Sequence, residues 1–377
     1  MSLRLALFYV AIFLVIGIQL PFWPVWLASR GMGPGEIGVL LAAAGATRIV
    51  VAPAIAPLAD RLGRRRPIVI ALAAGALIAT AIFAVTYGFW ALLAVSVLAA
   101  AFFTVLLPMV ESLTVIAARD HGVDYGRVRL WGSLAFILAA TGGGQMLSRL
   151  DAALVLWLVL GALALTFAAS LALPDLRTPR TARGAGRMRL FLRREFVLFI
   201  LATSLMQASH AVYYGFATLH WRAAGHSETL IGALWAEGVI AEVALFAVSG
   251  AAIAARIAPV PLLVIAAAGG AARWSVLGLT DAVWALACAQ ALHALTFGAS
   301  HLAAIRFILR EVPAEMTSTA QSLYYSVAGG IVSALFMLGA GWLYAGFGAH
   351  AYFAMAAASI AGGAVALAAG RLKPATA

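Results

Sequence analysis

The chain has 377 residues, of which 64% are hydrophobic and only 10% are charged. A soluble domain averages about 25% charged residues, so this composition excludes a soluble globular protein and predicts a protein with many membrane-spanning helices. The formal net charge of +11 does not indicate nucleic-acid binding, because arginine and lysine collect in the cytoplasmic loops of membrane proteins. The single cysteine, Cys288, cannot form an internal disulfide, and no cysteine–histidine group has the spacing of a metal site.

A spanning helix needs about 20 apolar residues, and the apolar segments of this chain predict twelve such helices. The connections between them are short, apart from one polar stretch near the middle of the chain. The predicted helices cover residues 4–28, 36–59, 67–87, 89–118, 128–148, 152–173, 196–222, 229–254, 259–279, 282–308, 318–345 and 350–370.

The long polar stretch divides the predicted helices into two sets of six. We therefore expect an N-terminal bundle at residues 1–173, an arginine-rich linker at 174–195 and a C-terminal bundle at 196–377. Arginine residues gather in this linker and in the loops on the same side, which predicts that both termini are cytoplasmic. We expect a monomer in a bacterial-type inner (plasma) membrane, in contact with lipids whose anionic headgroups suit the linker arginines.

The two halves share a short pattern. Residues 35–40 (GEIGVL) resemble residues 228–234 (ETLIGAL), and placing Gly38 on Gly232 gives an offset of 194 positions. Parallel six-helix repeats are typical of the major facilitator architecture, in which the substrate site lies near the middle of the membrane between the halves.

The loop at residues 60–66 (DRLGRRR) matches the D-R-x-G-R-R pattern that follows the second helix in the major facilitator superfamily. The chain resembles that family over its whole length. The resemblance implies an all-α membrane protein with twelve helices in two pseudo-symmetric six-helix bundles, acting as a transporter and not as an enzyme. It also implies that the loop latches the cytoplasmic side, whereas a simple positive loop is the alternative. The latch residues would be Asp60, Arg61, Gly63, Arg64 and Arg65.

Within the superfamily, the chain resembles the lactose-permease-like proton symporters, and among these the phenylpropionate permeases. The resemblance implies that Glu111 and Arg129 bind the substrate, with an aromatic platform at Phe136. It also implies a part in proton coupling for Arg273 and His293. Thr296 stands where a proton-carrying glutamate would be expected, so coupling must use another carboxylate or be absent. The matching segments are residues 21–27, 125–133, 210–214, 218–221 and 292–294.

The charged residues in apolar segments support the same view. A charge at the centre of a spanning helix costs roughly 2.5–3.5 kcal/mol on insertion scales, so such residues usually face a wet cavity or a partner. Glu111 and Arg129 are 18 positions apart on either side of a turn, which predicts that they meet. The repeat offset relates Arg48 to Glu242. Both residues are candidates for the site, and a static ion pair with a neighbouring helix is the alternative for each.

We predict that Glu242 carries the proton, since burial favours the neutral form of a carboxyl group. Glu237, nearer the outer surface, is a weaker candidate. His210 and His293 would either exchange protons with Glu242, contact the substrate, or hydrogen-bond to neighbouring helices.

Uncharged residues complete the predicted site. Tyr213, Tyr214 and Phe136 could hold an aromatic ring, and Gln19 could hydrogen-bond to the substrate or to a helix. We expect Trp23, Trp26 and Trp221 to be anchors at the outer membrane interface.

The sequence thus predicts a secondary active transporter that carries a small organic acid, phenylpropionate-like, together with a proton. Arg48 or Arg129 would hold the carboxylate, and no cofactor is needed beyond the proton gradient. Glu111 argues for the alternative, a sugar or a nucleoside, because it would repel an anion unless protonated. A multidrug exporter is a second class. A membrane enzyme or receptor finds no support, since no nucleophile–base group and no large extramembrane domain are present.

Overall fold

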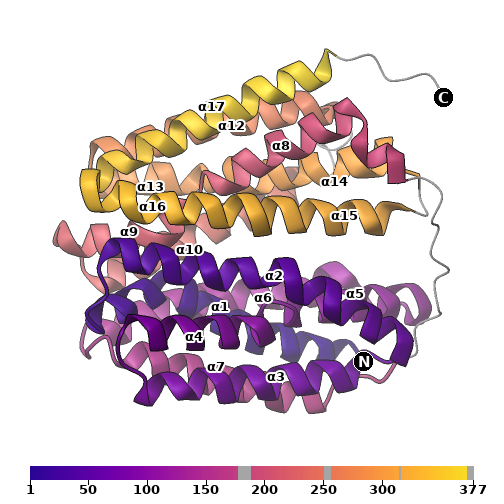
Figure 1. Ribbon diagram of the computed structural model, residues 1–377, viewed down its shortest axis with the longest axis horizontal. Coiled ribbons are helices and arrows are strands. Elements are labelled where there is room, and N and C mark those ends of the chain that lie inside the picture. Colours follow the sequence, from indigo (N-terminus) through magenta and orange to yellow (C-terminus); the bar gives the residue numbers. More distant parts are fainter. Residues whose placement is uncertain (177–187, 250–255, 314–315, 372–377) are drawn as a thin grey trace. The chain divides into compact units, whose positions relative to one another are not determined.

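The structure is a computed structural model that describes residues 1–176, 188–249, 256–313 and 316–371 (Figure 1). Every element in this part of the chain is a helix, as predicted. Among the described residues, eleven stretches are long and apolar enough to span a membrane. The last of these, Thr319–Gly370, contains both helices predicted at 318–345 and 350–370, which are separated by the tight turn η7 (Gly348–His350). The all-α membrane fold is therefore confirmed, and the count of twelve depends on dividing this last stretch.

Contacts between residues divide the chain into two compact units. The first comprises Met1–Ala182 and Ala217–Ala236, and the second comprises Arg183–Phe216 and Glu237–Ala377. The predicted domain limits at 1–173 and 196–377 stay a prediction. Half of the predicted linker, residues 177–187, lies outside the described residues.

The first unit is built around α1. This helix is mostly buried, and it packs on α6 and α7, while α3 packs on α4 and α7. Small residues bring α1 and α6 together, because a Cβ atom added at Gly17 would lie only 2.8 Å from Ala139 Cβ. The helices are α1 (Ser2–Ser29), α2 (Pro34–Leu62), α3 (Arg66–Ala81), η1 (Ile82–Val85), α4 (Phe89–Phe103), α5 (Leu106–His121), α6 (Tyr125–Leu147) and α7 (Leu154–Leu171).

One predicted helix of this unit is divided. The segment expected at 89–118 forms α4 and α5, with a break at Thr104 and Val105, three residues before Pro108. Proline lacks a backbone N–H group and clashes with the preceding turn of a helix, which accounts for the break.

The described residues of the second unit include three π-helical turns, in which the backbone hydrogen bonds join residues five positions apart. The helices are η2 (Met188–Leu192), α8 (Arg194–Ala208), α9 (Ala211–Ala223), α10 (Glu228–Ala244), η3 (Leu245–Ser249), α12 (Pro259–Leu279), α13 (Val283–Ala291), η4 (Ala294–Ala299), α14 (Ser300–Glu311), α15 (Thr317–Ser326), η6 (Val327–Val332), α16 (Ser333–Phe347) and α17 (Ala351–Gly370). The segment Ala217–Ala236, which covers the end of α9 and the start of α10, is grouped with the first unit.

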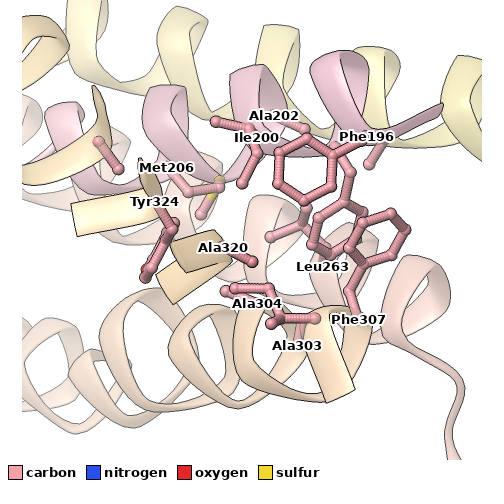
Figure 2. Packing of buried hydrophobic residues seen from close by; sticks show 14 of the residues in the cluster. Phe196, Ile200, Ala202, Met206, Leu263, Ala303, Ala304, Phe307, Ala320 and Tyr324 are labelled. Carbon is pink, nitrogen blue, oxygen red and sulfur yellow. The ribbon is translucent and has the colours of Figure 1, made fainter. Parts of the chain in front are cut away.

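An apolar cluster holds α8, α12, α14 and α15 together (Figure 2). Phe199 and Phe307 stack face to face with ring centroids 3.8 Å apart, and alanine residues such as Ala303 and Ala320 fill the remaining space. Close packing of small residues is the usual way in which helices associate in membranes, where no hydrophobic force drives them together.

Candidate functional site

Glu111 and Arg129 meet in the first unit, as their spacing predicts. Arg129 Nε lies 3.8 Å from Glu111 Oε1, and about a third of each side chain is exposed. The chain reverses between them because α5 ends at Gly122, whose φ of +65° few other residues adopt. The Asp124 side chain then caps α6 by accepting a hydrogen bond from the Arg127 backbone N–H group.

Arg129 is surrounded by aromatic rings. Its guanidinium carbon lies 4.2 Å from the ring centre of Phe13 and 5.9 Å from that of Tyr9. Gly132 makes room for this arrangement, since a Cβ atom there would be 2.8 Å from the Phe13 ring and 3.2 Å from Arg129 Nη1. The contact with Glu111 is longer than a hydrogen bond. The guanidinium group is thus held by rings and only loosely by its carboxylate partner.

The other predicted residues of the first unit differ in exposure. Phe136 is only 4% exposed, so its ring has little open surface, and its backbone lies against Gly17 of α1. Arg48 and Gln19 are half-buried. The substrate-binding roles of all three stay predictions.

The expectation for the tryptophan residues was wrong. Trp23, Trp26 and Trp221 are 6%, 1% and 1% exposed, so they do not present their rings as interfacial anchors. Trp23 and Trp26 stack on each other, and both meet the edge of Phe83.

Arg273 is the centre of a buried polar network in the second unit. Its side chain is fully buried and donates hydrogen bonds of 2.9 Å to His293 Nδ1, Thr296 Oγ1 and Gln290 Oε1. Its guanidinium carbon also lies 4.6 Å from the rings of Tyr213 and Trp274. We call Arg273, His293, Thr296 and Gln290 the Arg273 network.

The network fixes the hydrogen positions on two histidine residues. An arginine can only donate, so His293 Nδ1 is an acceptor and the proton of the neutral ring is on Nε2. His210 Nδ1 faces two backbone carbonyl oxygen atoms, those of Met206 at 3.1 Å and Gln207 at 3.3 Å, so Nδ1 must donate. His210 Nε2 then accepts from the Thr296 hydroxyl group, 3.2 Å away.

Glu242 lies next to this network. His293 Nε2 is 3.9 Å from Glu242 Oε2, and the two side chains are 10% and 21% exposed. The ring of His293 packs close to α10 at Gly238, where a Cβ atom would lie 3.4 Å from His293 Cβ. Arg273, His293 and Glu242 therefore form a line from a buried cation to a partly exposed carboxylate. Glu237, five residues earlier on α10, is half-buried.

The tyrosine residues predicted to hold a substrate ring have structural contacts. Tyr213 is 2% exposed, and its hydroxyl group accepts a 2.7 Å hydrogen bond from Gln290 Nε2. Tyr214 is half-buried and stacks on His210 with centroids 5.4 Å apart. Sequence reasoning missed Gln290, although it lies three residues before His293, as Thr296 lies three residues after it. That spacing on a helix places all three on one face.

The predicted latch residues lie at the end of α2. Gly63 ends the helix with a φ of +63°, and Arg64 forms a two-pronged ion pair with Asp175 at the start of the predicted linker. Arg61 is exposed and Arg65 is half-buried. The side chain of Asp60 lies outside the described part of the structure, so the latch stays a prediction.

Comparison with known proteins agrees with this architecture. The model of the MFS_1 like family matches residues 2–355. The chain is 35% identical over 366 residues to a "Probable 3-phenylpropionic acid transporter" of Escherichia coli (strain K12), with 93% of each protein covered. It is 29% identical to a maltose permease of Geobacillus stearothermophilus, covering 86% of this chain and 83% of that protein. The crystal structure of the nucleoside transporter NupG superposes with a TM-score of 0.85 at 15% identity, covering 99% of each chain. The chain therefore belongs to the MFS_1 like family and is an integral membrane transporter of the major facilitator type, not an enzyme.

Proposed function

We propose that this transporter carries a small organic acid with an aromatic ring, together with a proton, by alternating access. The observation that carries the proposal is the state of Arg129. This guanidinium group is partly exposed, lies against Phe13, and has a carboxylate neighbour that is too distant for a hydrogen bond. The 35% identity to a probable 3-phenylpropionic acid transporter supports the same class of cargo.

Arg129 can bind the carboxylate of the cargo while it keeps its contact with Glu111. Its Nε atom faces Glu111, so the two terminal nitrogen atoms are the ones that would receive the cargo. A guanidinium group binds a carboxylate through two parallel hydrogen bonds, and such charge-assisted bonds are stronger than neutral ones. Glu111 would repel the anion if it were charged. We therefore infer that Glu111 is neutral, and donates a hydrogen bond, when the cargo is bound.

Proton coupling would use Glu242. Among the intramembrane carboxylates, Glu242 is the one beside the Arg273 network, through His293. Taking up a proton would remove its charge and let the loaded carrier reorient. His293 would act as a hydrogen-bond donor toward Glu242, since its Nδ1 atom is occupied by Arg273. Glu237 and His210 are the other candidates for proton transfer.

A sugar is the second candidate cargo. The maltose permease that is 29% identical to the chain favours it, and Glu111 could accept hydrogen bonds from hydroxyl groups. For either cargo we propose a monomer in a bacterial-type inner membrane, with both termini cytoplasmic and the proton gradient as the energy source.

Uptake into proteoliposomes tests the proposal. Radiolabelled 3-phenylpropionate should accumulate when the inside is alkaline, and a protonophore should abolish the accumulation. Because the protonated acid also crosses lipid unaided, the uptake measured in protein-free liposomes and in liposomes with the Arg129→Gln variant must be subtracted. Maltose added in excess should not compete. Uptake no faster than in protein-free liposomes would reject the acid, and competition by maltose would favour the sugar.

A further inference from the structure

Gln290 joins two helices of the second unit through its side-chain amide. This residue of α13 is fully buried. Its Oε1 atom accepts a 2.9 Å hydrogen bond from Arg273 Nη2, and its Nε2 atom donates a 2.7 Å hydrogen bond to the Tyr213 hydroxyl group. Because an arginine can only donate, the amide oxygen must face Arg273, which fixes the orientation of the amide. Gln290 therefore connects Arg273 on α12 to Tyr213 on α9.

The direction of the Arg273 guanidinium group depends on its two terminal nitrogen atoms. Among the described residues, its Nε atom has no hydrogen-bond partner. Its Nη1 atom donates to His293 Nδ1 and to Thr296 Oγ1, whereas its Nη2 atom donates to Gln290. A guanidinium group is planar and rigid, so the hydrogen bond at Nη2 also sets the direction in which Nη1 points. The hydrogen bond from Arg273 to His293 therefore depends on Gln290.

Gln290 also acts on Arg273 through Tyr213. The guanidinium carbon lies 4.6 Å from the centre of the Tyr213 ring, and the hydroxyl group of that ring is bound by Gln290. The face of an aromatic ring attracts a cation, but a hydrogen bond restricts the angle at the donor much more narrowly. The ring thus holds the guanidinium group in place, and Gln290 sets its rotation.

The position of Arg273 decides whether His293 can hold a proton on Nδ1. While Arg273 donates to Nδ1, that atom is an acceptor, so the ring is neutral and its proton is on Nε2. This Nε2 atom lies 3.9 Å from Glu242 Oε2. If Arg273 turned away, Nδ1 could take a proton. His293 would then either change its tautomer, and lose the donor that faces Glu242, or become a cation beside that carboxylate.

We propose that Gln290 is a positioning residue for proton coupling, which holds Arg273 against His293 Nδ1 and so keeps that atom without a proton. The inference rests on the proposed function, which makes Glu242 the proton carrier. With Nδ1 occupied, a proton that enters this part of the unit goes to Glu242 and not to His293. Without Gln290, His293 competes with Glu242 for the proton, and accumulation of the cargo loses its coupling to the proton gradient.

The test is NMR on purified protein in which the histidine nitrogen atoms are isotope-labelled, because nitrogen atoms with and without a proton give separate resonances. The His293→Asn variant identifies the His293 signals by their absence. At neutral pH, we expect the wild-type Nδ1 resonance to be that of a nitrogen atom without a proton. Gln290→Met keeps a flexible side chain of similar length but removes both hydrogen bonds, so most of this resonance should be lost to protonated forms. Gln290→Glu keeps an acceptor for Arg273 and should retain the resonance.

Gln207 provides a matched control in the same unit. Its side-chain amide donates a 3.4 Å hydrogen bond to the Tyr324 hydroxyl group, so Gln207→Met removes an amide–tyrosine contact outside the Arg273 network. The His293 signals should not change in this variant. If Gln290→Met does not fold, Gln290→Asn is judged by the same resonance, because its amide is one carbon shorter and cannot reach both Arg273 and Tyr213.

The outcomes separate the role of Gln290 from the proposed function. An Nδ1 atom that stays without a proton in folded Gln290→Met protein would overturn the inference, as would an equal loss of the resonance in Gln207→Met. In proteoliposomes, Gln290→Met should reduce uphill accumulation of 3-phenylpropionate and keep counterflow exchange; accumulation at the wild-type level would also overturn the inference. If the wild-type protein does not accumulate this acid, the proposed function fails, whereas the NMR spectra still decide whether Gln290 positions Arg273.

Discussion

Replacing Arg129 by glutamine tests the cargo site, because the structure separates its effect on folding from its effect on binding. The charges of Arg129 and Glu111 lie 3.8 Å apart on side chains that are about a third exposed. At an effective dielectric constant of about 20, unit charges at this distance attract each other by roughly 4 kcal/mol before hydration is counted. Hydration and side-chain entropy offset most of this attraction, and exposed pairs contribute about 0–1 kcal/mol net. We expect Arg129→Gln to lower the free energy of unfolding by about 1 kcal/mol or less.

The loss of binding should be much larger. A hydrogen bond to a charged group contributes about 1.5–3 kcal/mol, and 1.4 kcal/mol corresponds to about a tenfold change in Kd. Arg129→Gln should therefore raise the Kd for 3-phenylpropionate by about 10-fold to 100-fold, and by more if both terminal nitrogen atoms bind the carboxylate. The assay is equilibrium binding to purified protein, with thermal unfolding of the same sample as the measure of folding.

Arg127 provides a matched control two residues away. Its side chain is 88% exposed and pairs with Asp124, so Arg127→Gln removes the same charge from the same helix without touching the proposed site. Its Kd should stay within about twofold of the wild-type value, since exposed charges are well screened. Folded Arg129→Gln protein that binds 3-phenylpropionate normally would refute the reasoning. An equal loss of affinity in both variants would mean that the positive charge at this end of the helix, and not a specific contact with Arg129, attracts the anion.

Other substitutions test the proton site, the latch and the helix packing. Glu242→Gln mimics the protonated carboxyl group, so it should abolish uphill accumulation of the cargo yet keep counterflow exchange. If the variant still accumulates cargo with the wild-type pH dependence, Glu242 is not the proton carrier. Asp60→Ala should slow transport severalfold with an unchanged Kd, because the loop controls the conformational equilibrium; a large loss of affinity would contradict this. Gly144→Ala should lower the free energy of unfolding by about 1–3 kcal/mol, since its Cβ atom would lie 2.3 Å from a backbone oxygen of α10. Gly142→Ala, with open space at its Cβ position, should be neutral or stabilising by about 1 kcal/mol in the same thermal unfolding series.

Charged residues in apolar segments were the most informative part of the sequence. The cost of an isolated charge in a membrane is large, so the presence of Glu111 and Arg129 on either side of a short turn was enough to predict their contact. The same reasoning identified Glu242, whereas the resemblance to the lactose-permease-like symporters identified His293. The structure brings these two residues to 3.9 Å. Their roles in transport stay predictions, because a contact between two side chains does not show that a proton moves between them.

Aromatic residues could not be placed in this way. An apolar ring has no large penalty that restricts it to one environment, so the sequence did not distinguish an open pocket from the interior. Phe136 and Tyr213 are buried, and Trp23 packs against Phe83 instead of facing the interface. The stacking of Phe297 between His293 and His301 was also not predicted. These rings flank and include the π-helical turn at Ala294–Ala299, which the hydrophobic pattern does not reveal.

Thr296 shows how a single position links these findings. A glutamate at this position could pair directly with Arg273, whereas the threonine accepts one hydrogen bond from Arg273 and donates one to His210. The hydrogen-bond acceptors of Arg273 thus include the neutral groups of His293, Thr296 and Gln290. Its positive charge still favours a negative charge nearby, since a buried cation attracts an anion across a medium of low dielectric constant. Glu242, reached through His293, is the carboxylate placed to respond to that charge. The threonine at position 296 is therefore compatible with the proposed proton coupling, because Glu242 on α10 offers a carboxylate 3.9 Å from His293.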